Sequence, residues 1–180
     1  MPRPLPPISP SPLRRVRLPW TEAADIALWL KRDDLLHPHI SGNKWRKLAP
    51  NLEAAVAAGH HRLLTFGGAY SNHLAAVAAA GRLLGFETVG IVRGERIEPL
   101  NPTLAFAERQ GMQLHFLSRS EFRLRKKPDA WPEWQARFGP CCILPEGGSN
   151  DLAVRGCTAI AREVEATGLR PDWWVVAAGT

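Results

Sequence analysis

Short apolar runs alternate along the chain with longer segments in which apolar residues recur at helical spacing. The apolar runs 62–68, 88–94 and 113–119 predict strands, whereas 71–85 and 101–111 predict helices between them. Strands that alternate with helices are joined by right-handed crossovers and form a parallel sheet. The pattern therefore predicts an α/β fold with an open, mainly parallel twisted sheet and flanking helices.

The N-terminal side of this pattern is less regular. Residues 1–19 are rich in proline and predict an extended arm that lies over the domain. A strand is expected at 25–34. A helix is expected from Asn43 to a glycine stop at Gly59, and Pro50 would kink or divide it.

The C-terminal side continues the alternation. We expect an irregular helix at 120–140, a short buried strand within 141–149 and a helix at 150–168. The last residues, 172–180, have the composition of a buried strand that reaches a glycine turn. Because a stable domain rarely ends on an uncovered core strand, we interpret the chain as a fragment of a longer protein.

The charge of the chain is unbalanced, with a net value of +6. Much of the excess lies in two clusters, LRRVR at 13–17 and RLRKK at 123–127. Neither cluster has the aromatic platform or the recognition-helix pattern that reads bases, so nucleic acid is not an expected partner. A solvated basic surface, or one that attracts small anionic ligands, is the better interpretation.

The cysteines and the hydropathy indicate where the chain resides. Cys141, Cys142 and Cys157 are odd in number and form no C-x-x-C motif, which fits a reducing cytoplasm. No apolar run approaches the roughly 20 residues of a membrane span. We therefore expect a cytoplasmic protein without a membrane partner.

Several common motifs of chemistry are missing from the sequence. It has no dinucleotide fingerprint, no phosphate-binding P-loop and no nucleophile elbow. The close pairs His37/His39 and His60/His61 lack the cysteine or carboxylate spacing of a metal site. We interpret these four histidines as surface-loop residues and expect no metal.

The stretch GGAYSNH, residues 67–73, is the first candidate for function. It places Ser71, Asn72 and His73 after a glycine turn, at the start of a helix. Free backbone N–H groups and the helix dipole favour an anion there, and a carboxylate would fit as well as a phosphate. The alternative is that Ser71 or Asn72 only caps the helix. The double glycine favours function, because close approach to a ligand needs residues without a Cβ.

The second candidate is Lys44, in the stretch DDLLHPHISGNKWRKL at 33–48. A lysine that forms an imine must be partly neutral, and burial together with nearby cations lowers its pKa. Lys47 lies one helical turn further along and could repel the charge of Lys44 or hold a phosphate beside it. A solvated lysine on a basic helix is the alternative.

Three stretches together resemble a known family. KRDDLLHPHISGNKWRKL, then TFGGAYSNHLAAVAAAGRLLGFETVGIVRG, then LPEGGSNDLAVRGC are similar to the aminocyclopropane-carboxylate deaminase and D-cysteine desulfhydrase family. These pyridoxal-phosphate enzymes have the fold type II architecture of tryptophan synthase β. The resemblance runs from about residue 9 to the last residue and implies that the C-terminal half of the fold is missing.

The resemblance implies roles for individual residues. Lys44 would hold pyridoxal phosphate as a Schiff base and later move a proton. Asn72 would bind the cofactor's ring oxygen, and Ser71 would lie at the substrate carboxylate, helping in proton transfer. Asn72 and the backbone N–H of His73 would also contact that substrate. Lys47 would reach the phosphate, as would the start of a glycine-rich loop at Gly179 and Thr180.

The resemblance also implies a domain organisation and an assembly. Residues 1–50 would be an arm and the start of the large cofactor domain, 51–168 the small α/β domain, and 169–180 a return strand into the large domain. We expect a homodimer for the whole protein. The substrate would be a small amino acid, converted to an α-keto acid and ammonia, with sulfide released from D-cysteine.

Departures from the family pattern leave the function open. The serine motif continues as SNHLAAV rather than with Thr-Arg-Gln, so D-cysteine and the cyclopropane amino acid are not distinguished. The single tyrosine, Tyr70, is not where the family places its substrate-facing tyrosine. A cysteine-synthase-like β-replacement enzyme and a truncated, non-catalytic anion-binding α/β module are the alternatives.

Overall fold

A four-stranded parallel sheet forms the upper part of the molecule in the computed structural model, which describes residues 2–6, 9–40 and 42–177. The strand order is β5-β4-β3-β6, and every neighbouring pair is parallel. The mainly parallel α/β fold expected from the alternation is therefore confirmed. The strands are β3 (Arg62–Gly68), β4 (Glu87–Arg93), β5 (Met112–Leu117) and β6 (Cys142–Leu144).

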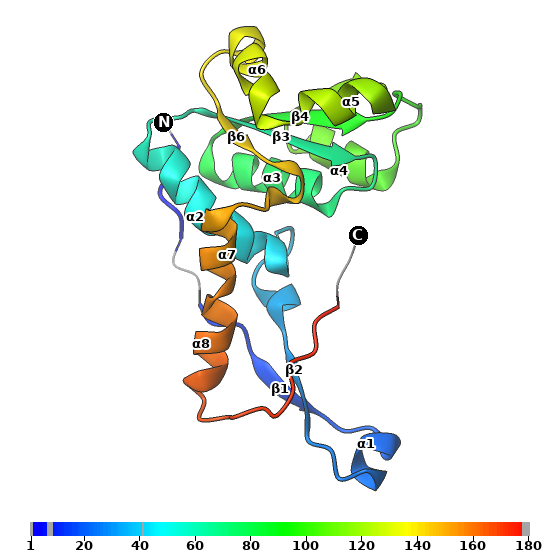
Figure 1. Ribbon diagram of the computed structural model, residues 1–180, viewed down its shortest axis with the longest axis vertical. Helices are drawn as coiled ribbons and strands as arrows, with labels where there is room; N and C mark the ends of the chain where they lie inside the picture. Colours follow the sequence, from blue (N-terminus) through cyan, green and yellow to red (C-terminus); the bar gives the residue numbers. More distant parts are fainter. Residues whose placement is uncertain (1, 7–8, 41, 178–180) are drawn as a thin grey trace.

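Helices cover both faces of this sheet (Figure 1). One face carries α3 (Asn72–Leu84) and α4 (Pro102–Arg109), and α2 (Asn43–Ala57) packs against α3. The other face carries α5 (Arg119–Arg125) and α6 (Trp131–Phe138), joined by a 3-10 turn at Pro128–Ala130. The irregular helix expected at 120–140 is these three pieces.

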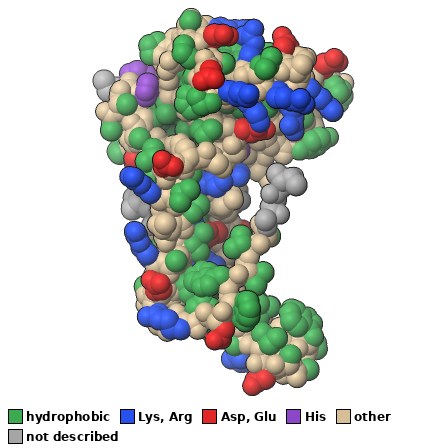
Figure 2. Space-filling model, in the orientation of Figure 1, with side chains coloured by type: hydrophobic (Ala, Val, Ile, Leu, Met, Phe, Trp, Pro, Cys, Tyr) green, Lys and Arg blue, Asp and Glu red, His purple; other side chains and the backbone are tan. Residues whose placement is uncertain are grey.

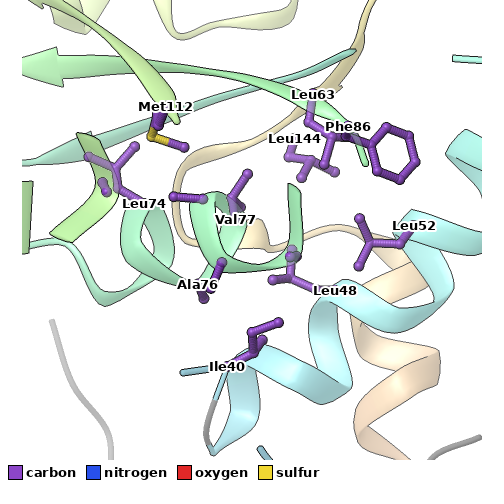
Figure 3. Packing of buried hydrophobic residues seen from close by; sticks show 14 of the residues in the cluster. Ile40, Leu48, Leu52, Leu63, Leu74, Ala76, Val77, Phe86, Met112 and Leu144 are labelled. Carbon is purple, nitrogen blue, oxygen red and sulfur yellow. The ribbon is translucent and has the colours of Figure 1, made fainter. Parts of the chain in front are cut away.

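Two hydrophobic cores, one on each face, hold the sheet between its helices. Neighbouring residues of β3 point to opposite cores, since Leu63 belongs to the first and Leu64 to the second. Figure 3 shows the first core, where side chains from α2 and α3 meet those of the strands. In the second core the rings of Phe66, Phe122 and Trp134 pack edge to face around Phe66.

A narrower extension lies below the sheet in Figure 1. It contains the antiparallel pair β1 (Leu13–Val16) and β2 (Leu28–Lys31), connected through α1 (Pro19–Ala23). After β6 the chain returns through the 3-10 turn η3 (Glu146–Gly148) and the helices α7 (Asp151–Cys157) and α8 (Ala159–Glu165). Hydrophobic side chains gather on the surface of this lower part (Figure 2).

The structure corrects several predicted elements of this extension. The strand predicted at 25–34 is only Leu28–Lys31, and its partner β1 lies within the arm that was expected to be extended throughout. The helix predicted at 150–168 is interrupted at Thr158, between α7 and α8.

The buried strand predicted at 172–180 is not formed over the part that the structure describes, 172–177. Trp173 is 86% exposed and Val175 is 92% exposed, and no described strand lies beside them to supply hydrogen bonds. An apolar sequence forms a core strand only where a sheet is present to pair with it.

Pro50 neither divides α2 nor interrupts its packing. The helix is continuous from Asn43 to Ala57, although Pro50 has no N–H to donate to the carbonyl of Arg46. Helix α7 approaches that carbonyl through Gly156, where an added Cβ would lie only 2.0 Å from the Arg46 oxygen. Close packing of α7, which only glycine permits, therefore covers the gap in the hydrogen-bond ladder of α2.

The buried guanidinium of Arg46 joins three parts of the chain. It binds Asp33 through two hydrogen bonds, from Nε (2.6 Å) and Nη2 (2.7 Å). It also binds Glu163 of α8 through two, from Nη1 (2.7 Å) and Nη2 (2.9 Å). Lys31 pairs with Glu163, and the Ser11 hydroxyl donates to Asp33. We call these five residues the Arg46 network.

Protonation equilibria in the Arg46 network make it sensitive to acid. Burial works to raise the pKa of Glu163, but hydrogen bonds and charges from Arg46 and Lys31 lower it from 4.5 to about 2. The pKa of Asp33 is lowered in the same way. Because these pKa values fall on folding, the stabilisation is complete above about pH 4.5 and is lost as the pH approaches 2.

We predict that Arg46→Met destabilises the fold by about 3–5 kcal/mol, because it leaves two carboxylates buried without their cation. The free energy of unfolding is measured by urea denaturation at neutral pH. Arg32→Met, which removes an exposed pair with Asp34, is the matched control and should change the midpoint little. Equal losses in the two variants would show that the Arg46 network has no special structural importance.

Candidate functional site

A cavity of about 880 Å³ opens at the carboxyl ends of β3 and β4. Ligands of open parallel sheets bind at this edge, because the loops that follow neighbouring strands meet there. Lys44, Ser71, Asn72 and His73 all line the cavity, although Lys44 comes from a different helix than the other three. The two candidate stretches of the sequence therefore face one space.

Lys44 enters the cavity from the first turn of α2. Gly42 precedes the helix with a φ of +63°, a conformation that L-residues with a side chain rarely adopt. Burial lowers the pKa of Lys44 below 10.5, and the nearby charge of Lys47 lowers it further, while Cys157 opposes the shift. The neutral amine needed for imine chemistry is thus favoured by the two causes that the sequence suggested.

Lys47 does not line the cavity, although it lies one turn after Lys44. Its Nζ donates a hydrogen bond to the Ser149 hydroxyl at 2.9 Å. Its charge nevertheless contributes to the lowered pKa values of both Lys44 and His73. In this structure Lys47 acts on the cavity through its electric field rather than by facing into it.

Ser71 both caps α3 and faces the cavity. Its side-chain oxygen accepts the backbone N–H of Leu74 at 3.3 Å, so the capping interpretation is correct as far as it goes. The Ser71 O–H remains a donor. The N–H groups of Asn72 and His73 lie in the first turn, where a helix offers them no internal acceptor. The start of α3 can therefore bind a carboxylate.

The two glycines before Ser71 have structural explanations that the sequence did not reveal. A Cβ on Gly67 would lie 2.6 Å from the Ser71 oxygen and 2.9 Å from Leu74. A Cβ on Gly68 would lie 3.3 Å from the guanidinium of Arg93. Gly67 allows α3 to pack against its own strand, so this glycine is not by itself a sign of a ligand.

The imidazole of His73 is almost completely buried and is held in one tautomer. Thr65 donates its hydroxyl proton to the Leu144 carbonyl (3.0 Å), so it accepts from Nε2 of His73 (2.8 Å). Nδ1 is then a bare acceptor, and it has no hydrogen-bond partner among the described residues. Burial, with the charges of Lys44 and Lys47, lowers the pKa of His73 from 6.5 to about 3.

Sequence reasoning missed three side chains of the cavity. His39 was interpreted as a surface-loop residue, yet it lines the cavity beside α2. Arg93 ends β4 and Glu146 follows β6, so both lie at the carboxyl ends of strands that neighbour β3. The end of each apolar run was the signal that could have indicated these two positions.

Two predicted site residues cannot be placed. Gly179 and Thr180, the expected start of a phosphate loop, lie outside the described residues. No group of three or more His, Cys, Asp or Glu residues that could hold a metal occurs in the described part of the chain. A search of the same residues finds no helix long and apolar enough to cross a membrane.

Comparison with known proteins identifies the family. The sequence signature described as "Pyridoxal-phosphate dependent enzyme" matches residues 5–180. The chain belongs to this family. Pyridoxal phosphate is therefore the cofactor expected at the cavity, and the resemblance suggested by the lysine and serine stretches is confirmed.

Named relatives point to one part of this family. The chain is 32% identical over 173 residues to the "Bifunctional D-cysteine desulfhydrase/1-aminocyclopropane-1-carboxylate deaminase, mitochondrial" of Arabidopsis thaliana, covering 91% of this chain and 43% of that protein. It is 30% identical to a "Putative 1-aminocyclopropane-1-carboxylate deaminase" of Pyrococcus abyssi, covering 86% and 48%. The chain thus spans about half the length of the curated relatives it matches.

Solved structures support the same fold. A crystal structure described as an "ACC deaminase homologue" superimposes with a TM-score of 0.75 at 25% identity, covering 91% of this chain and 50% of that one. A threonine deaminase whose source is given as T.th. shares only the fold, with a TM-score of 0.65 at 18% identity, over 89% and 48%. The expected fold type II architecture is therefore confirmed.

The residues of the cavity fit one end of the family's cofactor. Lys44 offers an amine with a lowered pKa, as an aldehyde partner requires, and Asn72 offers a side-chain amide on the same wall. The bare Nδ1 of His73 shows that the site already contains a buried acceptor without a donor. The described part of the chain therefore suits the reactive end of the cofactor.

We predict that His73 remains neutral, with its proton on Nε2, well below the pH at which an ordinary histidine is charged. The cost of charging a buried imidazole beside two cations is the reason. Nitrogen-15 NMR of the two ring nitrogens across a pH titration measures both the tautomer and the pKa. Thr65→Val should remove the Nε2 acceptor and mix the tautomers. A His73 signal that titrates near 6.5 in the native protein would contradict this account.

Proposed function

We propose that this chain provides the lysine and the carboxylate-binding half of the active site of a pyridoxal-phosphate-dependent lyase. Its reaction would be deamination or β-elimination on a small amino acid of the D-cysteine or 1-aminocyclopropane-1-carboxylate type. The observation that carries the proposal is that Lys44, with a lowered pKa, shares a cavity with the start of α3. The relatives named above support the same reaction class.

Lys44 would have two tasks in this reaction. Its neutral amine would hold the cofactor's aldehyde carbon, and once released it would move a proton to or from the substrate. The bound cofactor supplies an electron sink for the negative charge that develops on the substrate. The same lowered pKa serves both tasks, because a neutral amine is a nucleophile and a base.

The start of α3 would hold the substrate. The N–H groups of Asn72 and His73, with the helix dipole, favour a carboxylate at this position. The Ser71 hydroxyl faces the cavity and can donate to that carboxylate or pass a proton near it. The side-chain amide of Asn72 would orient the cofactor ring. His73, neutral and fixed by Thr65, would keep this helix start rigid.

Two alternatives differ in their products. A β-replacement enzyme of the same fold would release a new amino acid only when a second nucleophile is supplied. A non-catalytic module would bind anions at α3 without making a keto acid. Sulfide and ammonia released from D-cysteine without an added nucleophile would favour the proposed elimination. The homodimeric assembly, the cytoplasmic location and the division at residues 50 and 168 remain predictions.

We predict that borohydride reduction in the presence of pyridoxal phosphate labels Lys44 more than any other lysine, because its amine is more often neutral. Peptide mass spectrometry locates the label. Since the chain spans about half the length of its relatives, we expect the unreduced cofactor to be lost on gel filtration.

Lys44→Ala and Lys127→Ala form a matched pair for this experiment, because Lys127 is an exposed lysine outside the cavity. Labelling should disappear from the first variant and persist in the second. Labels spread evenly over the lysines of the native protein would refute the role of Lys44.

A further inference from the structure

A second hollow, of about 430 Å³, lies at the same edge of the sheet and is lined by four cations. Arg93 ends β4, Arg119 follows β5, and Arg123 and Lys126 project from α5 and the residue that ends it. Phe122 forms the fifth wall. We call these residues the basic pocket. In Figure 2, Lys and Arg side chains crowd the region where Figure 1 places α5.

The cations of the basic pocket are held in place rather than spread into solvent. Phe122 is buried beneath them, with the Arg93 guanidinium 5.8 Å and the Lys126 ammonium 5.7 Å from the centre of its ring. Such cation–π contacts fix where the charges lie. Side chains that are already ordered lose less entropy when a ligand binds.

Positive charge in the basic pocket is only partly neutralised by protein. Lys126 pairs with Glu146, and among the described residues Arg93, Arg119 and Arg123 form no ion pair. Nearby Arg125 differs, since it pairs with Glu133. Three free guanidinium groups around one hollow create a strong local attraction for a multiply charged anion.

We propose that the basic pocket binds a small polyphosphate, either free or as part of a nucleotide. Guanidinium groups present paired N–H donors that match phosphate oxygens, and several arginines suit a ligand with adjacent negative charges. A single carboxylate would leave most of these donors unused. The basic cluster at 123–127, noticed in the sequence as a possible attraction for small anions, contributes two of the four cations.

Arg93 gives this pocket a connection to the candidate active site. It lines both hollows, and its guanidinium lies against Gly68, three residues before Ser71. A polyphosphate that binds Arg93 would neutralise positive charge at the wall of the lysine cavity. The polyphosphate site does not depend on the proposed lyase activity, because its ligand and its residues other than Arg93 are separate.

The test is titration of the native chain with inorganic pyrophosphate at low ionic strength, followed by calorimetry and by amide NMR shifts. Binding should shift amides of the basic pocket. Arg119→Gln/Arg123→Gln should weaken binding by about tenfold or more, since two charge-assisted contacts are lost. Arg14→Gln/Arg15→Gln removes the same charge from exposed positions on β1 and should change the affinity little.

Each outcome bears on the proposal. Equal losses in the two double variants would reduce it to general charge attraction and overturn it, as would shifts confined to the start of α3. Adenosine diphosphate should bind comparably to pyrophosphate, because the polyphosphate is the recognised group. Binding of the nucleotide alone would overturn the proposal. Equal urea midpoints for the two double variants show that a loss of binding is not a loss of fold.

Discussion

The Arg46 network is the constraint on which the candidate site depends. Arg46 is separated from Lys44 by one residue, so the ion pairs that fix its guanidinium also fix the first turn of α2. Its partners come from the turn after β2 and from α8, so three distant parts of the sequence converge there. Removing one partner would leave a buried charge without compensation, which makes the arrangement costly to change.

This anchor explains how two separate stretches of the sequence can serve one reaction. The fixed start of α2 presents Lys44, while the core beneath β3 and β4 fixes the start of α3, which presents Ser71 and Asn72. His73 joins the two halves, because it is hydrogen-bonded to β3 through Thr65 and feels the charge of both lysines. Positioning of this kind is what a protein contributes to a cofactor's chemistry.

The sequence predicted the sheet well, because alternation of apolar runs and helices is a local signal. The strand expected at 62–68 coincides with β3, and the helix expected at 101–111 with Pro102–Arg109. Long-range features were missed. Pairing of β1 with β2 and the placement of His39 beside the cavity depend on tertiary contacts, which no local pattern encodes. The apolar segment 172–177 shows the same limit, since strand propensity without a neighbouring strand leaves it exposed.

The pKa of Lys44 tests the central claim most directly, because the anchored helix matters to chemistry only if it places this amine in a partly dry, positively charged environment. Carbon-13 NMR of the Lys44 ε-carbon against pH measures it, with Lys44→Arg used to assign the signal. The account predicts titration below the ordinary value of about 10.5 in the folded chain and a return to that value in urea. Titration at the ordinary value in the folded chain would contradict it.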